Sequence, residues 1–243
     1  MNSLELFKTQ KFYQIDISIL KDLGYDVLLS NRIFDSLLFW KYDILFSYFY
    51  RYSFFAALLA KCFGKKTYFT GGIDSLDSDY ASAFNYKIQA LFFKLCYWVA
   101  DSCIIVSQSD LKNIFKVSSL KKKLSYSEHV INTKLFIADV PKEKIFTSIV
   151  WMGDEGNVVR KGVDKALQIF AELKKIPEFV DYRFVIIGRK GEGEVLVRSI
   201  IDKYNLKGSV ELKGEVSEED KINLLKQSKY YFQLSLYEGF GLA

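Results

Sequence analysis

A basic side chain next to a glycine marks one turn in the C-terminal half of the sequence. Lys161 follows Arg160 and precedes Gly162, where the apolar periodicity of Val163–Lys175 predicts a helix. The free N–H groups and the dipole of a helix N-terminus favour an anion, so a lysine there would strengthen a phosphate site. On chemistry alone, an ordinary surface lysine in a loop is the alternative interpretation of Lys161.

Glycines also follow two predicted strands. Gly153 lies in the turn after the predicted strand Ile145–Met152, and Gly188 ends the predicted strand Tyr182–Gly188. Glycines at such positions let a ligand approach the backbone closely. The residues after Gly188 do not follow the G-x-G-x-x-G pattern, so a plain strand–helix turn is the alternative there.

A carboxylate lies among glycines near the end of the sequence. Glu238 follows Tyr237 and precedes the run Gly239, Phe240, Gly241 and Leu242. The carboxylate could bind sugar hydroxyls while the neighbouring amides lie close to phosphate or ribose. A plain turn seldom combines a glutamate, two glycines and an aromatic residue so tightly, so we interpret this turn as part of a ligand site.

Two other features could belong to a metal-binding or catalytic site. Asp77 and Asp79 are spaced like carboxylates that hold a divalent cation against a diphosphate. They fall in a polar loop, so we favour a solvated loop, with a metal site or an acceptor-contacting loop as alternatives. His129 is the only histidine, which argues against a histidine-based triad or zinc site. We interpret it as a turn residue or an interdomain contact.

The composition is typical of a globular protein. Of 243 residues, 50% are hydrophobic and 26% charged, and 21 Phe and 16 Tyr against 2 Pro argue against disorder. The net charge of +5 suits anionic small molecules or an anionic membrane surface. Because the lysines and arginines are scattered through amphipathic segments, we expect no nucleic-acid partner.

Cysteine spacing and hydropathy indicate the compartment. Cys62, Cys96 and Cys103 have no CxxC spacing, which predicts reduced, mostly buried thiols in a cytoplasmic protein. The charged N-terminal residues argue against a signal peptide. Charges interrupt the apolar stretch Ser36–Phe63, which predicts a strand and a helix rather than a membrane span. Its aromatic residues lie close to Lys and Arg, so peripheral contact with the inner face of the plasma membrane is a further expectation.

Short β-branched or aromatic runs alternate with helical patterns, which predicts an α/β fold of parallel βαβ units. Residues 5–23 predict an amphipathic helix, and so do residues 83–100. We expect the second helix to turn one apolar face inward, consisting of Phe84, Ile88, Leu91, Phe92, Leu95 and Val99. Besides the two strands given above, the predicted strands are Tyr25–Ser30, Asp43–Tyr48, Lys66–Thr70, Ser102–Ser107, Ser209–Lys213 and Tyr230–Ser235.

A change in composition predicts two domains. The stretch Lys116–Lys144 is rich in Ser and Lys and has weak periodicity, so we place a boundary near Val140-Pro141. The prediction is two Rossmann-like domains, residues 1–140 and residues 141–243. In such folds, ligands bind in a crevice at the carboxyl ends of the strands.

In their order and spacing, the turns resemble those of family-4 retaining glycosyltransferases (glycosyl transferases group 1), which have the GT-B fold. The resemblance is good over roughly residues 100–243 and looser before them. The most specific match is Glu-Gly-Phe-Gly-Leu at residues 238–242. The supporting matches are Lys-Gly at residues 161–162, a strand ending in Gly188, and Gly-x-Val at residues 214–216. The stretch His129–Phe136 is also similar to the turn before the family's second domain, with Asn132 where the family has aspartate.

The resemblance implies roles for individual residues. It gives Lys161 to the donor diphosphate and Glu238 to the donor sugar, both as catalytic residues. It implies no metal or other cofactor, because Lys161 would neutralise the diphosphate. The implied donor-binding residues are Gly153, Arg160, Gly188, Gly239, Phe240, Gly241 and Leu242.

The sequence departs from the family pattern at three places. Asp154 stands where the family usually has arginine, and no histidine follows the predicted strand Lys66–Thr70. The second glutamate of the family motif would fall beyond Ala243. We therefore expect a second domain that is incomplete and a chain that binds nucleotide sugars weakly.

The resemblance implies an activity of the hexosyltransferase type. A sugar would pass, with retention, from a nucleotide diphosphate-sugar donor to a glycan or lipid-linked acceptor in cell-surface polysaccharide synthesis. The alternative is a non-catalytic nucleotide-binding or accessory relative, or an inactive fragment.

Overall fold

The structure is a computed structural model that describes residues 3–9, 11–71, 76, 81–119, 121–137, 139–238 and 241. It contains two compact units, one made mainly of residues 1–130 and the other mainly of residues 131–238. The division lies before the boundary expected near Val140-Pro141. The reason is that the short 3-10 helix η4 (Thr133–Phe136) packs against α9 (Glu218–Gln227), which belongs to the second unit.

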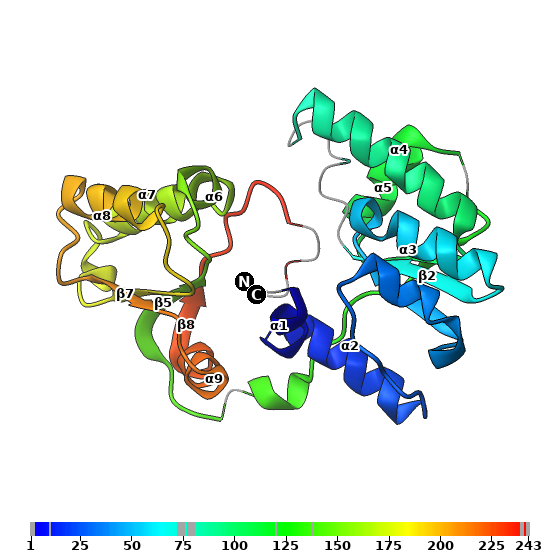
Figure 1. Ribbon diagram of the computed structural model, residues 1–243. Helices are drawn as coiled ribbons and strands as arrows, with labels where there is room; N and C mark the ends of the chain where they lie inside the picture. The colour runs from blue at the N-terminus through cyan, green and yellow to red at the C-terminus, as the bar shows by residue number, and fades with distance from the viewer. Residues whose placement is uncertain are drawn as a thin grey trace. The chain divides into compact units, whose positions relative to one another are not determined.

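The first unit is built on a parallel sheet with strand order β1-β2-β3-β4 (Figure 1). The strands are β1 (Ile44–Tyr48), β2 (Lys66–Thr70), β3 (Ser102–Ile105) and β4 (Leu124–Tyr126). The helices that the structure describes in this unit are α1 (Ser3–Thr9), α2 (Lys11–Asp22), η1 (Ile33–Leu37), η2 (Phe39–Lys41), α3 (Tyr50–Cys62), α4 (Ala83–Val99) and α5 (Gln108–Val117).

Aromatic side chains fill the core of the first unit. Tyr50 and Phe69 are both fully buried and stack with their ring centroids 5.5 Å apart. Phe93 tilts against Tyr50 at 5.2 Å, and the Cys96 thiol donates a hydrogen bond to the Tyr50 carbonyl oxygen. Burial of each such side chain stabilises the fold by about 2 kcal/mol, so this unit has a core of its own.

The α4 helix forms where periodicity predicts it, but only part of its predicted inward face is confirmed. Val99 is buried, and Phe92 and Leu95 pack against the core as partly buried side chains. Phe93, Cys96 and Tyr97 face the core, whereas Phe84 and Leu91 are exposed. The helix is apolar on nearly all sides, so the 3.6-residue period alone cannot identify the buried face. Tertiary packing decides it instead.

We expect Cys62 to be the fast-reacting thiol of the folded protein. Cys62 is exposed, whereas Cys96 and Cys103 are buried, so the prediction of mostly buried thiols is confirmed for these two. Burial raises the pKa of Cys103 to about 12 and raises that of Cys96 as well, which leaves little thiolate to react. Titration with a chromogenic disulfide reagent should show one fast thiol, and Cys62→Ser should remove it. Rapid reaction of a second thiol without denaturant would contradict this prediction.

The second unit also contains a parallel sheet, with strand order β7-β6-β5-β8. The strands are β5 (Glu143–Ile149), β6 (Arg183–Ile187), β7 (Val210–Gly214) and β8 (Ser228–Tyr231). Besides η4 and α9, the helices described in this unit are α6 (Glu155–Arg160), α7 (Val163–Leu173), η5 (Pro177–Phe179) and α8 (Glu194–Lys203).

The core of the second unit surrounds the central strand β5. The Phe146 ring stacks on Tyr230 and Phe232, with ring centroids 4.8 and 4.9 Å apart. The helix predicted at Val163–Lys175 is observed as α7, and its Val163 and Phe170 are both buried in this core. The sheet is thereby held rigidly, with its carboxyl edge available for loops.

Two predicted strands differ clearly from the structure, and one observed strand was not predicted. Tyr25–Ser30 is not a strand, because β1 pairs only with β2 and no other described strand lies beside it. The strand predicted at Tyr230–Ser235 ends at Tyr231; the Phe232 N–H still donates to the Thr147 carbonyl oxygen of β5, and further on the Leu236 N–H donates to the carbonyl oxygen of Arg160, the last residue of α6. The strand β4 was not predicted, because it is only three residues long and lies in a lysine-rich stretch.

Candidate functional site

Three loops of the second unit meet at the carboxyl edge of its sheet. The loop after β5 begins at Val150, the loop after β6 begins at Gly188, and residues 232–238 follow β8. Gly188 has φ +131°, and a Cβ built there would lie 2.1 Å from the carbonyl oxygen of Val150. Only glycine fits this close approach, so the predicted importance of Gly188 has a structural basis.

An ion pair between Lys161 and Glu238 lies at the centre of this edge. The Lys161 Nζ donates to the Glu238 Oε1 at 2.6 Å, and the two side chains are only 20% and 25% exposed. The same carboxylate oxygen accepts from the Ser235 hydroxyl at 2.7 Å and from the Gln233 Nε2 at 2.8 Å. Residues separated by 77 positions in the sequence are thus brought together as one polar cluster.

The cluster keeps Glu238 ionised. Burial of the Glu238 carboxyl raises its pKa, but hydrogen bonds from the Lys161 ammonium and the Ser235 hydroxyl lower it by more. The net effect is a pKa below the ordinary glutamate value. The carboxylate can therefore serve as an acceptor-only group for hydroxyls at neutral pH.

We expect the ion pair to contribute less to stability in acid. Because the folded-state pKa of Glu238 lies below its unfolded-state value, the unfolded state binds more protons between the two values. The stabilisation is present above the unfolded-state pKa, about 4.3, and is lost as the pH falls through the folded-state pKa. The difference in free energy of unfolding between wild type and Glu238→Gln should be larger at neutral pH than near pH 3. Urea unfolding at both pH values measures it, and an unchanged difference would contradict the prediction.

Lys161 lies directly before the N-cap of α7, as its sequence predicts, and it also follows a short helix that the sequence did not predict. The loop after β5 contains the short helix α6, and Lys161 is the residue that ends it. Gly162, with φ +68°, then separates this end from α7. The structure thus places Lys161 one residue before the N-cap of α7, in a tight turn between two helices.

Arg160 braces the loop that carries Glu238. Its guanidinium donates to the carbonyl oxygen of Tyr237 at 3.2 Å and to the side chain of Asn157 at 2.7 Å. Its own carbonyl oxygen accepts from the backbone N–H of Leu236 at 2.8 Å. These contacts fix the α6–α7 turn against residues 236–237, so Arg160 holds the cluster in place.

Two further side chains, Asp154 and Arg189, have clear structural partners. Asp154, found where the resemblance leads one to expect arginine, caps α6 by accepting from the backbone N–H of Asn157 at 2.6 Å. Arg189, not singled out in the sequence, lies with its guanidinium 4.6 Å from the ring centroid of Trp151. This pair brings a cation to the loops after β5 and β6, next to Gly153, where a Cβ would lie only 2.8 Å from the Trp151 ring.

Some of the remaining predicted residues lie within the described part of the chain, and the others lie outside it. Gly153 and Gly188 lie at the same edge as Lys161 and Glu238. Gly241 is described and has φ +77°. The predicted residues that lie outside the described part of the chain are Gly239, Phe240, Leu242, Asp77 and Asp79.

Sequence reasoning missed Gln233, Ser235, Trp151 and Arg189. Gln233 and Ser235 alternate with apolar residues directly before Glu238, which is a signal that these two side chains share one face; position 238 would fall on the other face if the alternation continued, and the chain bends at Leu236 instead. For the Trp151–Arg189 contact the sequence offers no comparable signal. Among the described residues, no group of three or more His, Cys, Asp or Glu side chains could hold a metal ion.

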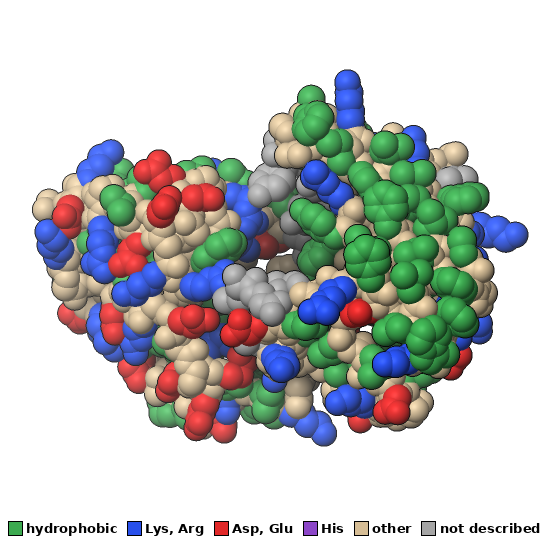
Figure 2. Space-filling view, viewed as in Figure 1, with side chains coloured by type: hydrophobic (Ala, Val, Ile, Leu, Met, Phe, Trp, Pro, Cys, Tyr) green, Lys and Arg blue, Asp and Glu red, His purple; other side chains and the backbone are tan. Residues whose placement is uncertain are grey.

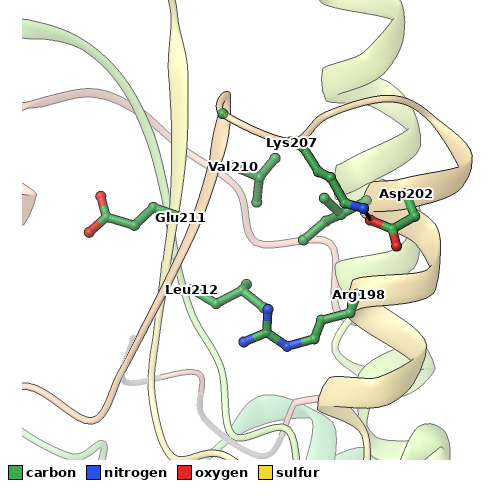
Figure 3. Close-up of a pocket in the computed structure, with 8 residues that line it drawn as sticks. Arg198, Asp202, Lys207, Val210, Glu211 and Leu212 are labelled. Carbon is green, nitrogen blue, oxygen red and sulfur yellow. Dashed lines mark ion pairs between the residues drawn. The ribbon is translucent and has the colours of Figure 1, made fainter.

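A pocket of about 530 Å³ lies elsewhere in the second unit, between α8 and β7 (Figure 3). Arg198 and Lys207 reach toward it, and Lys207 pairs with Asp202 at 2.9 Å. The pocket borders the start of β7, whereas ligands of doubly wound folds bind at the carboxyl ends of strands. We therefore assign the functional site to the Lys161–Glu238 cluster and not to this pocket.

The fold and this site together indicate the class of protein. Both units have an α/β fold with a parallel sheet, as in the GT-B glycosyltransferases of known structure that the chain resembles. Residues 156–243, which include both Lys161 and Glu238, match the family model described as glycosyl transferases group 1. The expected resemblance to that group is confirmed, while the narrower family-4 assignment stays a prediction. No curated protein sequence matches the chain.

Several solved structures are similar in fold. A mutant of S. aureus TarM in complex with fondaparinux, α-GlcNAc-glycerol and UDP has a TM-score of 0.61 at 17% identity, over 78% of this chain and 36% of TarM. Anabaena HepE with UDP and glucose has a TM-score of 0.66 at 13% identity, over 85% and 57%. Sucrose-phosphate synthase from Thermosynechococcus elongatus has a TM-score of 0.64 at 18% identity, over 83% and 52%. The chain thus spans less than two thirds of each of these proteins.

Proposed function

We propose that the protein is a retaining glycosyltransferase of the hexosyltransferase type, with a nucleotide diphosphate-sugar as donor and a hydroxyl of a glycan or lipid-linked sugar as acceptor. Cell-surface polysaccharide synthesis is the process that such an acceptor would serve. The observation that carries the proposal is the Lys161–Glu238 cluster, inside the segment that matches glycosyl transferases group 1.

The cluster contains a cation for the diphosphate of the donor and a carboxylate for its sugar. In the proposed reaction, the bond between the anomeric carbon and the diphosphate breaks, and negative charge develops on the departing oxygen. The Lys161 ammonium would stabilise that charge in a partly buried setting, where electrostatic interactions are stronger than in water. Glu238 would accept hydrogen bonds from the sugar hydroxyls, with Ser235 and Gln233 fixing its orientation.

UDP-sugars are the first donors to test, because HepE has been solved with UDP-glucose and TarM with UDP. We expect UDP release to depend on one donor of a UDP-sugar panel when alkyl glycosides are supplied as acceptors. The anomeric configuration of the product, read by NMR, should match that of the donor. An inverted product, or no release with any nucleotide sugar, would contradict the proposal. Excess EDTA in parallel reactions tests the further proposal that no metal is required.

A second candidate is a non-catalytic relative that binds a nucleotide. The observation that favours it is Asp154, which caps α6 and puts a negative charge where the resemblance leads one to expect arginine. Calorimetric binding of UDP without any turnover would support this candidate over the transferase. Equal turnover by wild type and Asp154→Asn would show that transferase activity does not depend on the Asp154 carboxylate.

A further inference from the structure

The outward face of α4 carries large apolar side chains. Phe84, Leu91 and Trp98 are 70%, 55% and 70% exposed, although the helix also buries an apolar face in the core. They are spaced seven residues apart, which places them in one stripe along the helix. A stripe of this kind on a helix that already has its core contacts is unusual for a surface in contact only with water.

Lysines alternate with these apolar side chains. Lys87 and Lys94 lie three residues after Phe84 and Leu91, so they belong to the same exposed stripe. Lysine has a long apolar stem and a charged end, so it can place its ammonium at a polar boundary while the stem lies along apolar surface. The stripe therefore combines large apolar side chains with positively charged ones.

The neighbouring helix α3 continues the surface. It packs beside α4, where Phe54 contacts Phe92 with ring centroids 6.2 Å apart. Its Tyr52 and Phe55 are 76% and 55% exposed. Figure 2 shows apolar side chains gathered over this part of the first unit, with basic side chains among them.

The charges on the two helices are all of one sign. Neither α3 nor α4 contains an acidic residue, and their basic residues are Arg51, Lys61, Lys87 and Lys94. Of these, Lys61 forms an ion pair with Asp101. Trp and Tyr rings, apolar side chains and unbalanced positive charge are the features of protein surfaces that lie in the headgroup region of anionic bilayers.

A protein partner fits this surface less well than a bilayer. The exposed apolar side chains lie along convex helix faces, whereas a helix- or peptide-binding site is a groove. Among the described residues, no helix is long and apolar enough to cross a bilayer. The surface therefore matches contact in the plane of a membrane.

We propose that the α3–α4 face, defined by Tyr52, Phe55, Phe84, Lys87, Leu91, Lys94 and Trp98, binds the surface of a bilayer that contains anionic lipids. This role does not depend on the proposed enzymatic function. It goes beyond the expectation for the aromatic residues of Ser36–Phe63, because it keeps Tyr52 and Phe55 of that stretch and adds the exposed side chains of α4.

Co-sedimentation with vesicles tests this proposal. We expect the protein to bind vesicles of phosphatidylglycerol and phosphatidylcholine much more strongly than vesicles of phosphatidylcholine alone, with binding reduced by salt. Lys87→Gln with Lys94→Gln should weaken binding about tenfold or more, because each lysine near an anionic surface contributes about fivefold. Leu91→Ser with Trp98→Ser should weaken it about tenfold or more through the loss of buried apolar area.

A matched control uses an exposed helix of the second unit. Val195→Ser with Lys203→Gln makes the same kinds of change on α8 and should leave vesicle binding unaltered. Circular dichroism checks that every variant is folded, and the charge variant stays informative if the apolar one unfolds. Equal binding by all variants, or equal binding to neutral and anionic vesicles, would overturn the proposal. A dimer in sedimentation velocity that Leu91→Ser with Trp98→Ser dissociates would also overturn it, in favour of a second copy of the chain.

Discussion

Replacement of Lys161 by alanine should lower the rate of sugar transfer about a hundredfold, equivalent to about 3 kcal/mol of transition-state stabilisation. The reason is that the Lys161 ammonium lies in the polar cluster at the carboxyl edge of the second sheet, only 20% exposed. Its removal takes away the positive charge nearest to Glu238 at the proposed diphosphate site. The fold should persist, because Glu238 keeps its contacts with Ser235 and Gln233.

The matched control for this prediction is Lys165→Ala. Lys165 lies four residues further on, in α7, where its side chain is exposed. The same change of charge is thus made close to the site but outside the cluster. We expect Lys165→Ala to retain the wild-type rate within about twofold. Equal rates for both variants and wild type would show that Lys161 has no role at the reacting diphosphate.

Replacement of Gly162 by alanine should destabilise the second unit by about 3 kcal/mol or more. Gly162 has φ +68°, and a Cβ there would lie 2.1 Å from the carbonyl oxygen of Leu234. The left-handed conformation alone costs about 1 kcal/mol for alanine. The backbone clash adds strain of about 1–3 kcal/mol, because neither segment can move without separating Lys161 from Glu238. Urea unfolding followed by circular dichroism measures this effect.

Gly208→Ala separates the two causes. Gly208 has φ +85°, but no atom lies within 4 Å of a Cβ built there. We expect it to lose only about 1 kcal/mol, the conformational part of the effect. If both variants lost the same stability, the contact between Gly162 and Leu234 would not be a constraint on the fold.

Much of the fold follows from the sequence, for reasons that specific elements make clear. The strand Lys66–Thr70 is predicted to the residue, because a short β-branched and aromatic run stands between clear turn signals. The cap of α9 is likewise local, because the Ser217 hydroxyl accepts from the backbone N–H of Asp220, three residues further on. Such features are local, so the sequence alone contains what determines them.

Features that depend on distant contacts could not be predicted. The exposed position of Phe84 on α4 depends on which side of an apolar helix the sheet covers. The course of the chain after β8 includes a backbone hydrogen bond between Leu236 and Arg160, two residues far apart in the sequence. In both cases tertiary contacts override local propensity.

The site shows the same division. Lys161 and Glu238 could be singled out because charged residues among glycines are conspicuous. Their direct contact, and the two further donors from Gln233 and Ser235, depend on how the loops after β5 and β8 fold toward each other. The bracing role of Arg160 was likewise beyond prediction, since its partner is a backbone carbonyl.

The most direct test of the central claim is to map where UDP binds. Backbone amide NMR shifts are recorded as UDP is added to the protein, with the Lys161→Ala variant in parallel. We predict that the largest changes occur in residues 160–163, 188–190 and 233–238, and that they vanish in the variant. Changes centred on Arg198, Lys207 and Glu211, around the pocket between α8 and β7, would contradict the assignment of the site to the Lys161–Glu238 cluster.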